Sequence, residues 1–202
     1  QLMQPDTSLF CVARTVNPEL IAASEKLNVE LHWIQADLGG TEGLSAFMRE
    51  IAETVDAKRA RRVCLINNAA SLEPIGPVGT IPAPDDDAGS SSQEALAEAI
   101  TRSVGVNLIG PMLLTHLFVA HFGSLACERV VINISSGAAF SPMPGLSTYC
   151  TTKAGLNMFT AAAAADDNSQ SPIRFYAVSP GTVDTDMQRA LRAAGPDRLR
   201  HH

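Results

Sequence analysis

The sequence has few cysteines, and none of them form a pair at a metal-binding or redox spacing. The four thiols, Cys11, Cys64, Cys127 and Cys150, are widely separated along the chain. Zinc sites and thioredoxin-like motifs need closely spaced cysteines, so the sequence predicts neither, and no metal is expected. Three of the four lie in apolar runs, which predicts buried, reduced thiols and a cytoplasmic protein.

Basic charge is also scarce, with 15 Lys and Arg against 21 Asp and Glu and a net charge of −6. Nucleic-acid binding needs clustered cations to neutralise phosphates, so no nucleic-acid partner is expected. The basic cluster at 58–62 precedes an apolar strand and is interpreted as a solvated helix end. There is no uninterrupted apolar run of about 18 residues and no secretory pattern at the N-terminus. Neither a membrane span nor a signal peptide is therefore predicted.

Short apolar segments alternate with helical patterns along the chain. The expected strands are 9–13, 29–35, 63–66, 130–134 and 173–178, and the expected helices are 19–27, 44–55, 93–122 and 147–165. Continuous apolar runs such as Val63-Cys64-Leu65-Ile66 are typical of parallel strands covered on both faces. Such strands are joined by right-handed crossovers. The pattern predicts an α/β fold with a doubly wound, Rossmann-like parallel sheet in a three-layer α-β-α arrangement, with residues 1–202 forming a single domain.

Two parts of this fold have no counterpart in the sequence. Nucleotide-binding sheets of this kind open with a strand and a glycine-rich turn, whereas the first strand here resembles the second strand of such a fold. Gly39-Gly40-Thr41-Glu42-Gly43 follows a strand, but its spacing is not Gly-x-Gly-x-x-Gly. We interpret it as a loop that starts a helix. The last strand of such a fold and the helices before it also have no counterpart. The domain is therefore expected to lack the first strand and a C-terminal segment.

A serine, a tyrosine and a lysine occur close together near residue 140. Tyr149 and Lys153 are four residues apart, which makes them neighbours on a helix. An ammonium group near a phenol favours the phenolate, and this suits proton exchange. Ser136 ends a predicted buried strand, at the edge where parallel sheets bind ligands. Although Tyr-x-x-x-Lys alone is common on solvated helix faces, the upstream serine favours a proton-donating site.

The segments around these residues resemble the short-chain dehydrogenase/reductase family. The matching features are Asn67-Asn68-Ala69-Ala70 after a strand, Asn107 in the next helix, Ser136, Tyr149 with Lys153, and Pro180-Gly181 after a later strand. Ala70 stands where the family has glycine, a mild change unless the position needs a positive φ. The resemblance covers nearly the whole chain. Among the members it is greatest to sepiapterin reductases and bacterial benzil reductases.

The resemblance implies NADPH-dependent reduction of a carbonyl group. Tyr149 would donate the proton, Ser136 would orient the carbonyl oxygen, Lys153 would fix the ribose, and Asn107 would hold a water that relays protons to Lys153. The NADP(H) site would comprise Arg14, Asp37, Leu38, Asn68, Ala69, Ala70, Ile134, Tyr149, Lys153, Pro180, Gly181, Val183 and Thr185. The small-molecule carbonyl substrate would contact Ser136, Tyr149 and Met187. Arg14 at a strand end would favour the 2′-phosphate of NADPH.

Two other functions stay open at this point. A catalytically weak NADP-sensing regulator can use the same fold, although a sensor needs no proton donor. A hydrolase with Ser136 as nucleophile is a further possibility, but no Gly-x-Ser-x-Gly surrounds this serine. The small and apolar residues of the helices 93–122 and 147–165, including the alanine run 161–165, predict pairing with a second copy in a homodimer or tetramer.

Overall fold

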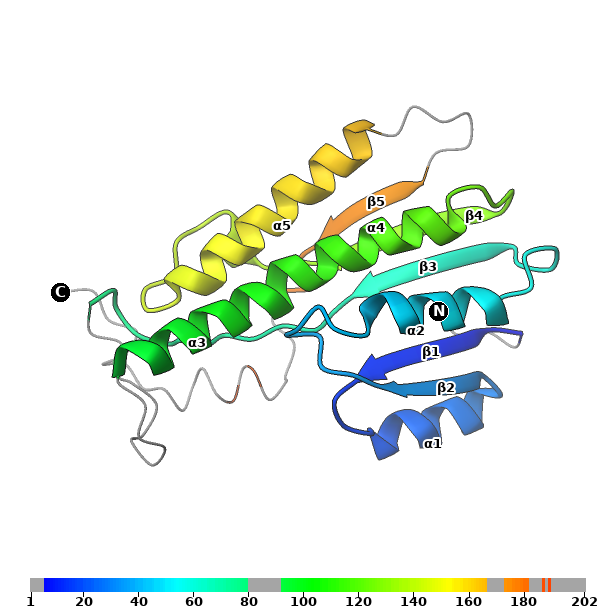
Figure 1. Ribbon diagram of the computed structural model, residues 1–202, viewed down its shortest axis with the longest axis horizontal. Coiled ribbons are helices and arrows are strands. Elements are labelled where there is room, and N and C mark those ends of the chain that lie inside the picture. The colour runs from blue at the N-terminus through cyan, green and yellow to red at the C-terminus, as the bar shows by residue number, and fades with distance from the viewer. Residues whose placement is uncertain (1–5, 80–91, 167–172, 182–186, 188, 190–202) are drawn as a thin grey trace.

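The five strands are all parallel and form two hydrogen-bonded groups. The computed structural model describes residues 6–79, 92–166, 173–181, 187 and 189. β1 (Ser8–Ala13) pairs with β2 (Glu30–Gln35), and β4 (Glu128–Ile134) lies between β3 (Arg62–Asn67) and β5 (Arg174–Val178). β1 lies beside β3 in Figure 1, although no ladder joins the two within the described ranges. The predicted parallel, doubly wound α/β fold is confirmed.

The helices begin and end close to the predicted positions. They are α1 (Pro18–Leu27), α2 (Leu44–Thr54), α3 (Ser92–Val104), α4 (Gly110–Phe122) and α5 (Ser147–Asp166), with a π-helical turn η1 (Gly105–Ile109) and a 3-10 turn η2 (Gly137–Ala139). The Asn17 side chain caps α1 by accepting from the Glu19 and Leu20 amides, and Asn28 ends it in the left-handed conformation. Local capping chemistry therefore sets these ends.

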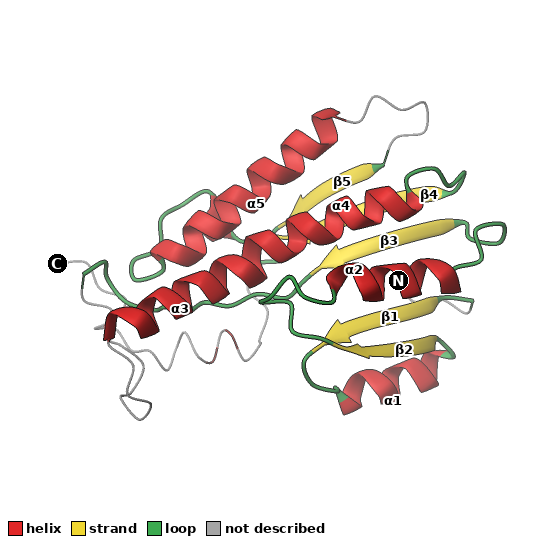
Figure 2. Cartoon of the chain, viewed as in Figure 1, coloured by secondary structure: helices red, strands yellow, loops and turns green. Residues whose placement is uncertain are grey.

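Three helices lie side by side on one face of the sheet. Figures 1 and 2 show α2, α4 and α5 in front of the strands, and α4 contacts both neighbours. Across the sheet, the chain moves from β1 to β2 in one direction and from β3 to β4 and then β5 in the opposite direction. The right-handed crossover rule therefore places α1 on the other face, which completes the three layers. The main core lies under α2 and α4 and comprises Leu44, Phe47, Met48, Leu114, Phe118, Phe122, Val131 and Ile173.

The expectation that the apolar strands are covered on both faces is wrong for β3 and β5. Ile66 is 44% exposed, Tyr176 46% and Val178 40%. Cys64 is also exposed, and none of the four free thiols is fully buried, which corrects the expectation of buried cysteines. The reason is that α1 packs on β2, and no helix of the described residues covers this face of β3 and β5. An apolar run identifies a strand without showing which faces are covered.

The predicted helix 93–122 is a single long helix with a π-helical turn in its middle, which the sequence pattern did not indicate. The helix has 30 residues, and its most apolar 18-residue window has a mean hydropathy of 1.6, so it is long and apolar enough to cross a membrane. However, half of its most apolar 18-residue window is buried inside the fold. It packs against α2, α5 and the strands, as the core helix of a globular domain does.

Candidate active site

The predicted site residues gather at the carboxyl ends of the strands. Those that directly follow a strand or lie one turn beyond it are Arg14, Asp37, Leu38, Asn68, Ala69, Ala70, Ser136, Pro180 and Gly181. The chain moves outward from β1 to β2 and then returns to β3, so this edge contains the switch point where open α/β sheets bind ligands. Arg14, Asn68, Ala69 and Pro180 are exposed there. Val183 and Thr185 lie outside the described residues.

Ala70 fits its position without backbone strain. Among the described residues other than glycine, a positive φ occurs at Asp6 and Asn28, not at Ala70. Gly181, in contrast, has a φ of 76°, a conformation that favours glycine. The change from the family's glycine at position 70 is therefore mild, as expected.

Asp37 is held in place by two hydrogen bonds. Its Oδ1 accepts from the Gly39 amide at 2.9 Å, and its Oδ2 accepts from Arg102 Nη2 at 2.8 Å. The amide hydrogen bond first, and then Arg102, lower the pKa of Asp37, and the charge of Arg14 acts in the same direction. The carboxylate therefore stays charged beside Arg14. Sequence reasoning missed Arg102, because no local pattern links it to a residue 65 positions away.

The glycine-rich segment 39–43 connects β2 to α2, as expected for a helix-start loop. Gly43 caps α2 with a φ of 77°. The loop lies directly on the π-helical turn, because a β-carbon at Gly105 would come within 2.4 Å of the Gly39 carbonyl oxygen. A β-carbon at Gly110 would lie 3.0 Å from the Leu38 carbonyl oxygen. Beside the loop, a groove of about 1040 Å³ runs past Asp37 and Arg102 between α2 and α3.

Ser136 stands where β4 ends. The Ser135 amide donates to the Val178 carbonyl oxygen at 2.8 Å, which extends the contact between β4 and β5 by one residue. Ser136 is half-buried, and its Oγ accepts from the Ala138 amide at 3.2 Å to cap η2. The hydroxyl keeps its own proton for another acceptor, so it can donate a hydrogen bond to a ligand oxygen.

Tyr149 lies in an apolar surrounding at the start of α5 and is 7% exposed. It forms a buried cluster with Leu72, Ile75, Ala138 and Leu146, and Met187 packs against this cluster. The predicted substrate-contacting residues Tyr149 and Met187 are therefore close together in the fold. An apolar wall beside a phenol suits a ligand that carries a carbonyl group on an apolar body.

Lys153 is buried beside Tyr149. Its Nζ donates to the Ile134 carbonyl oxygen at 2.7 Å and lies 5.7 Å from the centroid of the Tyr149 ring. Burial lowers the pKa of Lys153 to about 8. An ammonium group has three N–H donors, and within the described residues only Ile134 accepts from it. The remaining donors fit a pair of ribose hydroxyls, as a nicotinamide dinucleotide would present.

Asn107 is fully buried in the π-helical turn and clamps the loop that follows β3. Its Oδ1 accepts from the Ser71 amide at 2.7 Å, and its Nδ2 donates to the Ser71 carbonyl oxygen at 2.8 Å. Nδ2 also lies within hydrogen-bond distance of Ser103 Oγ and Thr152 Oγ1. Asn107 makes no direct bond to Lys153 within the described part of the chain, so the water relay stays a prediction. Helical π turns often occur at functional sites.

Asn67, the first residue of the Asn-Asn-Ala-Ala motif, points into the core and not to the open edge. Its Nδ2 donates to Asn133 Oδ1 at 2.8 Å, and Asn133 Nδ2 donates to Thr160 Oγ1 at 2.8 Å. This buried chain of hydrogen bonds joins β3, β4 and α5. It supports the position of α5, which carries Tyr149 and Lys153.

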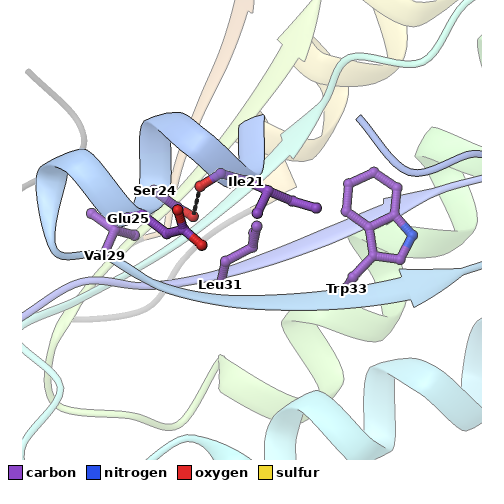
Figure 3. Close-up of a pocket in the computed structure, with 6 residues that line it drawn as sticks. All are labelled: Ile21, Ser24, Glu25, Val29, Leu31 and Trp33. Atoms are coloured by element: carbon purple, nitrogen blue, oxygen red, sulfur yellow. Dashed lines mark hydrogen bonds between the residues drawn. The ribbon is translucent and has the colours of Figure 1, made fainter. Parts of the chain in front are cut away.

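A smaller pocket lies away from this edge, between α1 and β2 (Figure 3). Its volume is about 370 Å³, and it is lined by Ile21, Ser24, Glu25, Val29, Leu31 and Trp33. The Ser24 hydroxyl donates its proton to the Ile21 carbonyl oxygen, so it could only accept a hydrogen bond from a ligand. None of the predicted site residues lines this pocket, and it is not part of the candidate active site.

The buried lysine predicts that the protein becomes more stable as the pH rises above 8. The pKa of Lys153 is about 8 in the fold against 10.5 for an ordinary lysine. Between these values the unfolded chain binds more protons, so the free energy of unfolding increases with pH. Because one pH unit corresponds to about 1.4 kcal/mol, the full increase is roughly 3 kcal/mol. Urea denaturation across this pH range measures it.

The Lys153→Met variant should lose this component of the pH dependence, because methionine fills the same space without a charge. Lys26→Met, which changes an exposed lysine on α1, should retain it. Identical pH dependence in the wild type and in Lys153→Met would mean that Lys153 is not desolvated in solution.

The comparisons with known proteins agree on one family. The short chain dehydrogenase family model matches residues 1–195. Benzil reductase ((S)-benzoin forming) from Bacillus cereus is 33% identical over 193 residues, which cover 95% of this chain and 72% of that protein. Sepiapterin reductase from Xenopus laevis is 30% identical over 204 residues, covering 97% and 71%. A solved short-chain dehydrogenase/reductase from Burkholderia vietnamiensis aligns with a TM-score of 0.68 at 30% identity, covering 92% of this chain and 76% of that one.

This family uses a nicotinamide cofactor. The N–H donors of Lys153 and the exposed residues at the switch point suit such a dinucleotide. Fold, site and comparisons lead to the same assignment: the chain belongs to the short-chain dehydrogenase/reductase family of oxidoreductases.

Proposed function

We propose that this protein reduces the carbonyl group of a ketone or diketone with NADPH. The observation that carries the proposal is the arrangement of Lys153, which is buried, bonded to Ile134 and next to the ring of Tyr149. Two relatives are named as reductases of benzil and of sepiapterin, which supports carbonyl compounds as the substrate class.

In the proposed reaction the nicotinamide, when bound, supplies the hydride. The Tyr149 hydroxyl donates a proton to the alkoxide oxygen that develops on the substrate. The Ser136 hydroxyl donates a hydrogen bond to the same oxygen and stabilises its growing charge. Lys153 binds the ribose hydroxyls and favours the phenolate that Tyr149 becomes. A water held near Asn107 would return a proton by way of Lys153.

The cofactor half of the site extends from Lys153 to Arg14. We assign Asp37 and Leu38 to the adenine, Asn68, Ala69 and Ala70 to the ribose, and Ile134, Pro180, Gly181, Val183 and Thr185 to the nicotinamide end. The exposed guanidinium of Arg14 at the end of β1 favours NADPH over NADH, because it can pair with a 2′-phosphate. The apolar cluster around Tyr149, with Met187, forms the wall against which the substrate lies.

A spectrophotometric assay tests the proposal. NADPH oxidation at 340 nm is followed with a diketone such as benzil, a pterin carbonyl and a ketosteroid. Turnover with any of these supports the enzyme. Saturable NADPH binding without turnover on the whole panel would instead favour the alternative, a regulator that senses NADP. Cleavage of an ester in the absence of NADPH would instead indicate a hydrolase with Ser136 as the nucleophile.

We also propose that the protein acts in the cytoplasm. We further propose that it forms a homodimer through η1, α4 and α5. Ile109 is 45% exposed, Val119 39% and Met158 71%, and the alanine run near the end of α5 is largely exposed. Large apolar side chains on helices favour burial against a second copy. Light scattering at micromolar concentration should give at least twice the mass of 21.4 kDa, and Met158→Glu should shift it toward the monomer. A monomer mass for the wild type would refute the interface.

A further inference from the structure

Thr152 is a buried threonine between the two residues of the Tyr-x-x-x-Lys motif. It is 1% exposed, whereas its neighbour Thr151 is exposed to solvent. Threonine is not a strong helix former, because its side chain is branched at the β-carbon. A buried threonine in the first turns of α5 therefore needs a reason, and the proposed reaction assigns it none.

The hydroxyl of Thr152 makes two hydrogen bonds in different directions. It donates to the Tyr149 carbonyl oxygen at 2.9 Å, and it accepts from Asn107 Nδ2 at 3.1 Å. A hydroxyl has one proton and two lone pairs, so both bonds can exist together. The first bond alone is a common local contact of threonine in helices. The second bond leaves the helix and reaches the π-helical turn, 45 residues earlier in the chain.

Asn107 continues the connection to the loop after β3. Its amide group bonds both to the N–H and to the carbonyl oxygen of Ser71, at 2.7 and 2.8 Å. α5 and η1 are in close contact beside this path, because a β-carbon at Gly155 would lie 3.3 Å from Leu108 Cδ2. The path from Ser71 through Asn107 to Thr152 therefore joins the loop that carries Asn68 and Ala69 to the turn that carries Tyr149.

We propose that Thr152 is a positioning residue, whose hydroxyl keeps the first turns of α5 in register with Asn107 and the loop after β3. It would act through Tyr149 and Lys153, without contact to the substrate. The catalytic consequence rests on the proposed carbonyl reduction, whereas the hydrogen-bond path does not. Asn107 Nδ2 has two protons and three acceptors nearby, so without the Thr152 hydroxyl these protons stay with Ser71 and Ser103. What is lost is the hydrogen bond that ties α5 to Asn107, and the clamp on Ser71 is then no longer held by this helix.

Three variants separate the hydroxyl from the rest of the side chain. Thr152→Val keeps the shape and removes the hydroxyl, Thr152→Ser keeps the hydroxyl, and Thr151→Val makes the first change at the exposed neighbouring position. Hydrogen exchange of the Ser71 amide, followed by NMR, reports the clamp without any substrate. We expect exchange about 10-fold faster in Thr152→Val and unchanged in the other two. Unchanged exchange in Thr152→Val would overturn the proposal.

The kinetic part of the test compares kcat with binding. Thr152→Val should lower kcat about 10-fold, since small displacements of reacting groups slow catalysis strongly. The dissociation constant for NADPH should stay within about twofold, and Thr152→Ser should behave as the wild type. Equal kcat in Thr152→Val and Thr151→Val, or a loss that Thr152→Ser does not restore, would refute the positioning role. If Thr152→Val does not fold, Thr152→Ala is measured in its place.

Failure of the proposed function gives a different result. If the wild type binds NADPH but reduces no carbonyl compound, the proposed function is wrong, and the exchange of the Ser71 amide still decides whether Thr152 holds this loop. If the wild type is active and the variants do not differ in exchange or kcat, only the role of Thr152 is wrong.

Discussion

Replacing Tyr149 with phenylalanine is expected to lower the rate of carbonyl reduction about 100- to 10,000-fold, the usual cost of losing a general acid. The ring would remain in its apolar cluster with Leu72, Ile75 and Ala138, so the fold should be preserved. Lys153 would keep its bond to the Ile134 carbonyl oxygen and thus its position for the ribose. The dissociation constant for NADPH should therefore change little, which fluorescence titration measures.

The second tyrosine of the chain provides a matched control. Tyr176 lies on β5 and is 46% exposed, so Tyr176→Phe removes the same hydroxyl at a position outside the site. Its kcat should equal that of the wild type. Turnover in Tyr149→Phe at the wild-type rate would show that another group donates the proton, and the proposed role of Tyr149 would have to be given up.

The Arg14→Ala variant is expected to lose most of the preference for NADPH over NADH. A charge-assisted hydrogen bond to phosphate contributes roughly 1.5 to 3 kcal/mol, which corresponds to about 10- to 150-fold in affinity. The backbone of Arg14 is fixed, because Gln35 Nε2 donates to its carbonyl oxygen at 3.0 Å, and the nearby Asp37 is already held by Arg102. The ratio of kcat/KM for the two cofactors measures the effect.

Arg59 is a suitable control for this change, since it is exposed and precedes the amino end of β3, opposite the site edge. Arg59→Ala should keep the wild-type cofactor ratio. If the wild type used both cofactors equally, or if Arg14→Ala left the ratio unchanged, Arg14 would be an ordinary surface residue.

Local patterns in the sequence were sufficient to predict the strands and helices and their order along the chain. Apolar runs, and the alternation of apolar and polar residues in 29–35, identified every described strand to within two residues at each end. The four-residue spacing of Tyr149 and Lys153 correctly implied a shared helix. These features depend on neighbours in sequence, which periodicity reports directly. The exposure of Cys64 and Ile66 could not be predicted in this way, because it depends on which helices cover the sheet.

The contacts that position the site residues could not be predicted from the sequence either. The ion pair of Asp37 with Arg102 and the hydrogen bond of Asn107 with Thr152 join residues 65 and 45 positions apart. The π-helical turn begins at Gly105 and ends just before Gly110 and Pro111, residues that weaken a helix without specifying a π turn. The turn carries the contact between Gly105 and the carbonyl oxygen of Gly39, two residues far apart in the sequence. Tertiary contacts of this kind leave no periodic signal.

The most direct test of the central claim follows the hydride itself. NADPH deuterated at the transferable position of its nicotinamide ring is incubated with the protein and benzil, or with another carbonyl compound that is turned over, and the product is analysed by NMR and mass spectrometry. Carbonyl reduction predicts one deuterium bound to the former carbonyl carbon, with a single stereochemistry, and none in the product from Tyr149→Phe over the same time. Tight binding of NADPH without transfer of deuterium to any carbonyl compound would contradict the proposed function.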